Sequence, residues 1–218
     1  MKRKTLTLTI MILGLSCLVV AQQSSVTDPG IDVATQLKQS KHHDKFILKY
    51  DKFKDYTVVA VKPMSLLSAM ESGAASFARS LGNGPYHTGP TINAPTQFAV
   101  TAAFGFKGTR LNEEPKFGFV FITDSGGWLF LKDHKLYALI DGERLELGEG
   151  QHDGDVYLGG VSEQMIFDLT REQFEKFANG KSVEIQLGGF PRKLKTEQIE
   201  KLKTLLSLAP KGSATGKP

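Results

Sequence analysis

The residues with the clearest chemical potential in this sequence lie in a short acidic, glycine-rich stretch. His152, Asp153 and Asp155 follow one another closely, and an imidazole together with carboxylates is a donor set that metal ions accept. Calcium needs six to eight oxygen ligands, and this stretch has too few carboxylates and no EF-hand spacing. We therefore predict no metal site and no cofactor, with these three residues as the weak metal candidates.

Carboxylates also act as general acids and bases, so a hydrolase that uses Asp153 and Asp155 is an alternative interpretation. Residues 100–103 and 123–127 resemble the signature peptides of chymotrypsin-like serine proteases. Phe104 stands where that family has its general-base histidine, so Ser125 lacks the imidazole that would activate it. The sequence identifies no catalytic residue, and the interpretation leans away from an enzyme.

Aromatic side chains form the third candidate. Between residues 98 and 130 they alternate with smaller or polar residues at a period of two, which indicates strands with one buried face. Their simplest role is to fill the core. A curved sheet of such residues can also hold an apolar ligand, and the residues assigned to that pocket are Phe104, Phe106, Phe119 and Trp128.

The charges at the start of the chain indicate export. Lys2, Arg3 and Lys4 precede an apolar run that ends at Ala21, the pattern of a cleavable signal peptide. The chain has 218 residues and a net charge of +4, and cleavage after Ala21 removes three of its 27 basic side chains, leaving 24 against 23 acidic ones. A nearly neutral chain argues against a nucleic-acid partner. No later apolar run approaches the length of a membrane-spanning helix.

Cysteine content narrows the chemistry further. Cys17, inside the predicted signal, is the single cysteine, so a chain cleaved after Ala21 has neither disulfides nor thiolate chemistry. The alternative is a lipoprotein that is anchored to the membrane through Cys17. We expect a periplasmic or extracellular location in either case.

The rest of the chain is predicted to form one domain. Residues 1–21 are the signal, 22–45 a polar leader, 46–208 the folded domain and 209–218 a disordered tail. Residues 65–81 have helical spacing, although Gly73 leaves a loop as the alternative. Two glycine-rich loops are predicted, 82–96 and 148–160, and they are candidates to form one shared site. Strands are expected at 46–50, 56–61, 98–106, 117–121, 128–131, 136–140, 143–147, 162–169, 182–187 and 192–194.

Two later helices carry start signals. Thr170 and Gln173 have the spacing of a capping box, and Asn179 with Gly180 predicts a left-handed stop. Thr196 is expected to cap the last helix, whose apolar face is formed by Ile199, Leu202, Leu205 and Leu206. Asp141 and Gly142 are typical of a tight hairpin turn.

From residue 163 onward the order strand, helix, strand, helix resembles the end of small exported bacterial proteins that are uncharacterised. The residues that carry the resemblance lie at 163–169, 174–178, 183–189 and 199–202, in total about a fifth of the chain. They are residues that form the fold, so the resemblance implies an architecture and no activity.

The predicted fold is an α+β domain, β-rich, with an antiparallel meander or sandwich-like sheet and two to three helices, the C-terminal one packed on the sheet. The function we expect is a non-catalytic binding or structural role in the bacterial envelope. A carrier of an apolar small molecule within the sheet is the first alternative, and the hydrolase is the second. An apolar ligand or an envelope protein is the expected kind of partner.

Overall fold

The computed structural model describes residues 30–67, 95–158 and 160–211. The predicted signal, most of the segment 65–81, loop 82–94 and the end of the predicted tail lie outside these ranges. Everything said below of the fold concerns the described residues.

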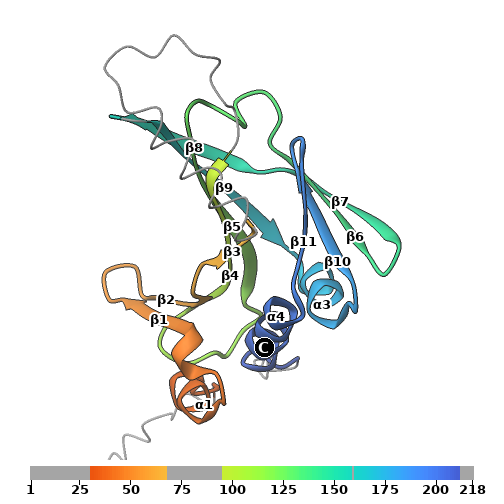
Figure 1. Ribbon diagram of the computed structural model, residues 1–218. Coiled ribbons are helices and arrows are strands. Elements are labelled where there is room, and N and C mark those ends of the chain that lie inside the picture. Colours follow the sequence, from red (N-terminus) through yellow and green to blue (C-terminus); the bar gives the residue numbers. More distant parts are fainter. Residues whose placement is uncertain (1–29, 68–94, 159, 212–218) are drawn as a thin grey trace, which may run out of the picture.

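A large antiparallel sheet forms one side of the molecule (Figure 1). Its strand order is β1-β2-β4-β5-β9-β8, and the short β3 also pairs with β4. The ladder between β4 and β5 is the longest, because both strands keep a period of two with phenylalanine on the inner face. The strands are β1 (Phe46–Asp51), β2 (Tyr56–Val61), β3 (Met64–Ser65), β4 (Pro95–Lys107), β5 (Lys116–Ser125), β8 (Gln151–Tyr157) and β9 (Gly160–Leu169).

A second antiparallel sheet has the order β11-β10-β6-β7. Its strands are β6 (Lys135–Ile140), β7 (Glu143–Glu149), β10 (Val183–Leu187) and β11 (Phe190–Lys193). The turn between β6 and β7 is the predicted one: Asp141 and Gly142 have φ values of 52° and 90°. Both central residues of a type I′ turn need positive φ, which Asp and Gly tolerate.

Three helices are described: α1 (Val33–Gln39), α3 (Arg171–Asn179) and α4 (Thr196–Ser207). The predicted capping box is present at α3, where the Thr170 hydroxyl accepts from Gln173 N and the Gln173 side chain accepts from Thr170 N. Two details of the prediction are wrong. Gly180 ends α3 in an extended conformation (φ −62°), and the N-cap of α4 is Lys195.

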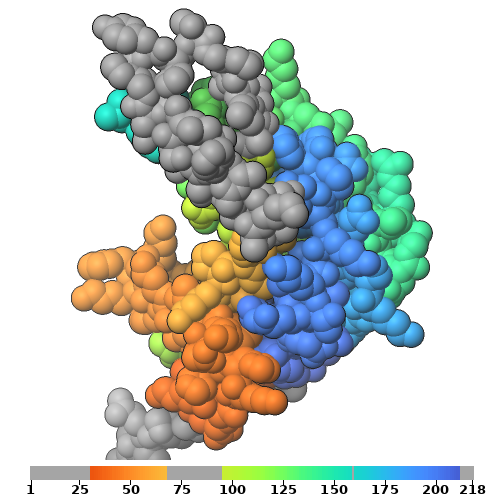
Figure 2. All heavy atoms as spheres, in the orientation of Figure 1, coloured from red at the N-terminus to blue at the C-terminus, as the bar shows by residue number. Residues whose placement is uncertain are grey.

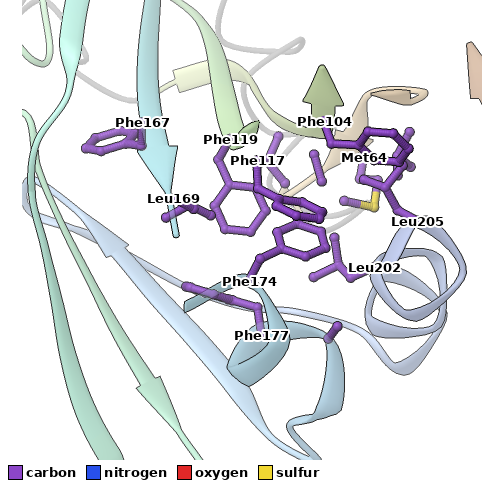
Figure 3. Close-up of a cluster of buried hydrophobic side chains, with 14 of the residues drawn as sticks. Met64, Phe104, Phe117, Phe119, Phe167, Leu169, Phe174, Phe177, Leu202 and Leu205 are labelled. Carbon is purple, nitrogen blue, oxygen red and sulfur yellow. The ribbon is translucent and has the colours of Figure 1, made fainter. Parts of the chain in front are cut away.

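The core lies between the inner face of the large sheet and the helices, which confirms the predicted β-rich α+β fold (Figure 3). The Phe174 ring of α3 stacks on Phe117 of β5 at 4.6 Å between centroids. Phe177 meets Phe119 edge to face at 5.0 Å. Helix α4, the C-terminal one, contacts β2 and β4 as well as α3. Such ring contacts stabilise the layer beyond simple burial.

The structure differs from the sequence prediction in two segments. Residues 128–131 do not form a strand; the chain from 126 to 134 is irregular where it passes from the large sheet to the second one. Residues 148–160 are mainly strand, because β7 continues to Glu149 and β8 begins at Gln151. β8 is an edge strand with a solvated face, which explains its polar composition.

The segment 22–45, which the sequence predicts to be a polar leader, contains a short helix. Helix α1 begins after Asp32, whose carboxylate accepts from Thr35 N. Val33 and Leu37 of this helix are buried in the core. The folded part of the chain therefore begins before residue 46.

Candidate functional site

A hairpin at one edge of the large sheet exposes five large apolar side chains among the described residues. We call β1, β2 and the turn between them the arm. In Figure 2 the arm projects from the side of the molecule. Phe53, in its turn, is 90% exposed. The other exposed large apolar side chains of the arm are Ile47, Leu48, Tyr50 and Val58.

The strand register distributes these side chains over both faces of the arm. Lys49 pairs with Val58, and Ile47 pairs with Ala60, so these side chains share the outer face. Leu48 and its alternate neighbour Tyr50 lie on the opposite face. β1 is an edge strand, so within the described residues its second row of backbone groups is unpaired.

Polar contacts within the arm hold its turn in place. The Asp51 carboxylate accepts from Phe53 N at 2.9 Å and from Lys54 N at 3.3 Å. The Tyr50 hydroxyl donates to Asp55 at 3.0 Å, and this hydrogen bond raises the pKa of Tyr50. Both aspartates of the hairpin are therefore engaged locally, and the turn that presents Phe53 is ordered.

A second apolar tip lies where β8 turns into β9. Val156, Tyr157 and Leu158 are exposed there, with Leu158 fully so at 103% of its reference area. The nearest charged residues on β8 are Asp153 and Asp155, both exposed. The two tips are alike in apolar exposure, but Lys52 and Lys54 stand directly beside Phe53, whereas the charged residues nearest Leu158 on its strand are the carboxylates Asp153 and Asp155.

Three of the four aromatic residues predicted to line a ligand pocket lie in the packed interior. Phe104, Phe106 and Phe119 are buried, and the Phe104 ring stacks on Phe106 at 6.1 Å. Trp128 lies apart from them and is partly exposed, with its ring edge on to His152. The carrier function stays a prediction, since the structure does not bring these four side chains into one cavity among the described residues.

Among the described residues, one acidic side chain is buried, at an inward position of β9. Glu163 of β9 is 1% exposed, and its carboxylate accepts from Leu129 N at 2.7 Å and from Phe130 N at 3.0 Å. His152 Nε2 lies 3.0 Å from the same carboxylate, and the His134 ring stacks on His152 with 5.6 Å between centroids. An ionised carboxylate only accepts hydrogen bonds, so the two amide donors and a ring N–H suit it.

This arrangement shows what Glu163 does in the fold. Its carboxylate takes the place of a strand partner for the backbone of residues 129 and 130, which explains why 128–131 is irregular. Phe130, held there, is fully buried and contacts Phe98 of β4 and Phe190 of β11. Glu163 therefore holds in place the segment 126–134, which connects the two sheets.

The weak metal candidates do not converge. His152 faces inward toward Glu163, whereas Asp153 and Asp155 alternate onto the exposed face of β8. Asp153 accepts from Gly154 N at 2.8 Å. Across the described ranges, no three His, Cys, Asp or Glu side chains are placed to hold one metal ion. Ser125 is buried, and its hydroxyl donates to the Gly127 carbonyl of its own turn.

The described surface also has a shallow depression of about 240 Å³ beside the β6–β7 turn. Lys176 of α3 and Glu143 both line this depression, and they form an ion pair with each other at 3.0 Å. Asp141 accepts from Ser182 N and Lys181 N, and these hydrogen bonds lower the pKa of Asp141. These polar groups are engaged in holding the turn against β10.

Sequence reasoning missed Glu163 and the exposure of the arm. A signal for Glu163 was present, because it falls in phase with the inward residues Val161 and Met165 of an alternating strand. A charge at an inward position needs partners. The sequence contains no comparable signal for the exposure of the arm, because an apolar run such as 46–48 is compatible with a buried strand and with an exposed one.

Comparison with protein-family models, with curated proteins and with solved structures finds no match to this chain. Within the described ranges, no helix combines the length and apolarity needed to cross a membrane.

Proposed function

We propose that this protein is an exported, non-catalytic binding domain of the bacterial cell envelope and that the arm is its binding surface. The observation that carries the proposal is the concentration of exposed apolar side chains on one ordered hairpin, with Phe53 90% exposed at its tip. Export rests on the sequence of residues 1–21, which has the layout of a signal peptide.

The contrast between the interior and the arm supports binding at the surface. The inner layer is filled by phenylalanine rings in mutual contact, from β4, β5 and α3. Apolar side chains that gather on a projecting hairpin instead of the core are typical of an interaction site. The unpaired edge of β1 adds backbone donors and acceptors to the same surface.

The test is a fractionation experiment in bacterial cells that express the full chain. We expect the processed protein to be recovered with the envelope fraction, and Phe53→Ser to shift it into the soluble periplasmic or extracellular fraction. Leu158→Ser is the matched control, because Leu158 is equally exposed at the other tip. If Phe53→Ser and the parent protein distribute alike, the arm is not the binding surface.

A further inference from the structure

We propose that the envelope component recognised by the arm is an anionic lipid surface, into which the Phe53 tip inserts while the surrounding lysines contact the headgroups. This inference rests on the proposed binding function of the arm and names its partner by chemistry. It is carried by the composition, the charge and the shape of the tip.

The tip combines one exposed aromatic ring with neighbouring ammonium groups. Lys52 and Lys54 flank Phe53, and Lys52 Nζ lies 5.1 Å from the centre of the Phe53 ring. All three side chains are exposed. At a membrane surface, an aromatic ring is stabilised at the acyl boundary while the long stems of lysines leave their charges among the headgroups. The tip presents both groups at the same point.

The arm and its base also carry the charge that anionic headgroups attract. Residues 41–62 contain six lysines and three aspartates, which gives a net charge of +3 with histidine neutral. The aspartates are occupied internally: Asp44 pairs with Lys45 at 3.0 Å, Asp51 holds the turn amides and Asp55 accepts from Tyr50. Lys49, Lys52 and Lys54 make no ion pair with a described residue. The segment therefore keeps its excess of three positive charges for an outside partner, although Asp51 and Asp55 remain charged within it.

The shape of the arm favours lipid over protein. Figure 2 shows the arm as a projection, and Phe53 lies in its turn with no described neighbour around most of its ring. A protein partner would have to supply a pocket of matching shape for high complementarity. A fluid headgroup layer needs no such pocket, and each nearby lysine strengthens partitioning roughly fivefold.

The β8–β9 tip provides an internal contrast. Leu158 is as exposed as Phe53, but Asp153 and Asp155 are the charges on its strand. An anionic surface repels these carboxylates, so this tip should not insert. Charge, and not apolar exposure alone, then decides which tip binds.

The experiment is co-sedimentation of the processed protein, recovered from cells after export, with sucrose-loaded vesicles. Vesicles of phosphatidylcholine alone are compared with vesicles that contain about one third phosphatidylglycerol. We expect at least tenfold tighter partitioning to the anionic vesicles, and weakening as salt rises from 0.1 to 0.5 M, because the Debye length shortens. Phe53→Ser should weaken binding about tenfold, and Lys52→Gln and Lys54→Gln roughly fivefold each.

Two variants complete the design. Leu158→Ser should bind like the parent, and Phe53→Trp should retain binding, because Trp is also stable at a membrane interface. Equal binding to both vesicle types, or equal loss in Phe53→Ser and Leu158→Ser, would overturn the inference. If Phe53→Ser releases the protein from the cell envelope while the parent ignores anionic vesicles, the lipid inference fails and the binding function of the arm stands with a protein partner.

Discussion

Two parts of the described molecule differ in how they place aromatic side chains: the layer between the large sheet and the helices, and the arm at the edge of that sheet. In the inner layer each ring has ring neighbours, as Phe117 and Phe174 show at 4.6 Å. In the arm, Phe53 is 90% exposed, and its ring contact is the cation of Lys52. The difference indicates that the inner layer supplies stability, whereas the arm leaves apolar area available for binding. Substitutions in the two parts should therefore separate stability from binding.

The largest effect on stability is expected from Phe174→Ala. Phe174 is fully buried and stacks on Phe117, so the substitution leaves a cavity in the middle of the core. The expected loss in the free energy of unfolding is about 3–5 kcal/mol. Urea unfolding followed by circular dichroism measures it, with Phe174→Leu as a milder control. A loss below that of the control would mean that the layer adapts to the missing ring.

Glu163→Gln should cause the next largest loss in the free energy of unfolding, about 2–3 kcal/mol. Hydrogen bonds to a charged group are stronger than those to a neutral amide, and the NH2 group of Gln would face a backbone N–H, which is also a donor. Glu163 accepts from Leu129 N and Phe130 N, so the exchange of these two amide protons should accelerate more than exchange in β4. Native-state hydrogen exchange by NMR measures this. The control is Glu184→Gln, on an exposed position of β10; equal acceleration in both variants would contradict the assigned role.

Asp141→Asn is expected to have a smaller effect that depends on pH. The N–H groups of Ser182 and Lys181 lower the pKa of Asp141, so the carboxylate stabilises the fold above its ordinary pKa. That contribution is lost as pH falls through the lowered value, below about pH 4. Asn keeps the positive φ of the turn. The difference in Tm between the two proteins should be present at pH 7 and shrink toward pH 2. A constant difference would point to a steric cause.

The smallest effect on stability is expected from Phe53→Ser. Its ring is almost fully exposed, so the free energy of unfolding should change by less than about 0.5 kcal/mol, although binding is expected to fall about tenfold. Leu158→Ser at the β8–β9 tip should leave both the free energy of unfolding and the binding to vesicles unchanged. Thermal unfolding beside the vesicle assay tests the pair. A Phe53→Ser variant that loses several degrees in Tm would show that the arm contributes to the fold.

The parts of the fold that follow from local patterns could be predicted from the sequence. The alternation in β4 and β5, the capping box of Thr170 and Gln173, and the turn at Asp141 each depend on neighbouring residues. The errors at 128–131 and 148–160 have a different origin. The conformation of 128–131 depends on the carboxylate of Glu163, which lies more than thirty positions away in the sequence. The strand in 148–160 depends on the position of β8 at the edge of the large sheet.

The candidate site was less predictable than the fold. The sequence assigned Phe104, Phe106, Phe119 and Trp128 to a possible pocket beside the simpler role of filling the core, and the structure buries the first three. Nothing local distinguishes Phe53 from them, because exposure depends on which elements cover a face. The apolar run of β1 resembles a buried strand, yet most of its side chains face solvent at the edge of the sheet.

The position of α4 has a consequence for the time at which this protein can fold. Helix α4, which buries Leu202 and Leu205, packs against β2 and β4, and these strands are synthesised long before it. β10, synthesised shortly before α4, also lies between β11 and β6 in the second sheet. In an emerging chain, the part of the inner layer that α4 covers therefore stays open until α4 has been synthesised. Apolar surface exposed during that interval favours aggregation, so the large sheet gains its full protection only when α4 docks.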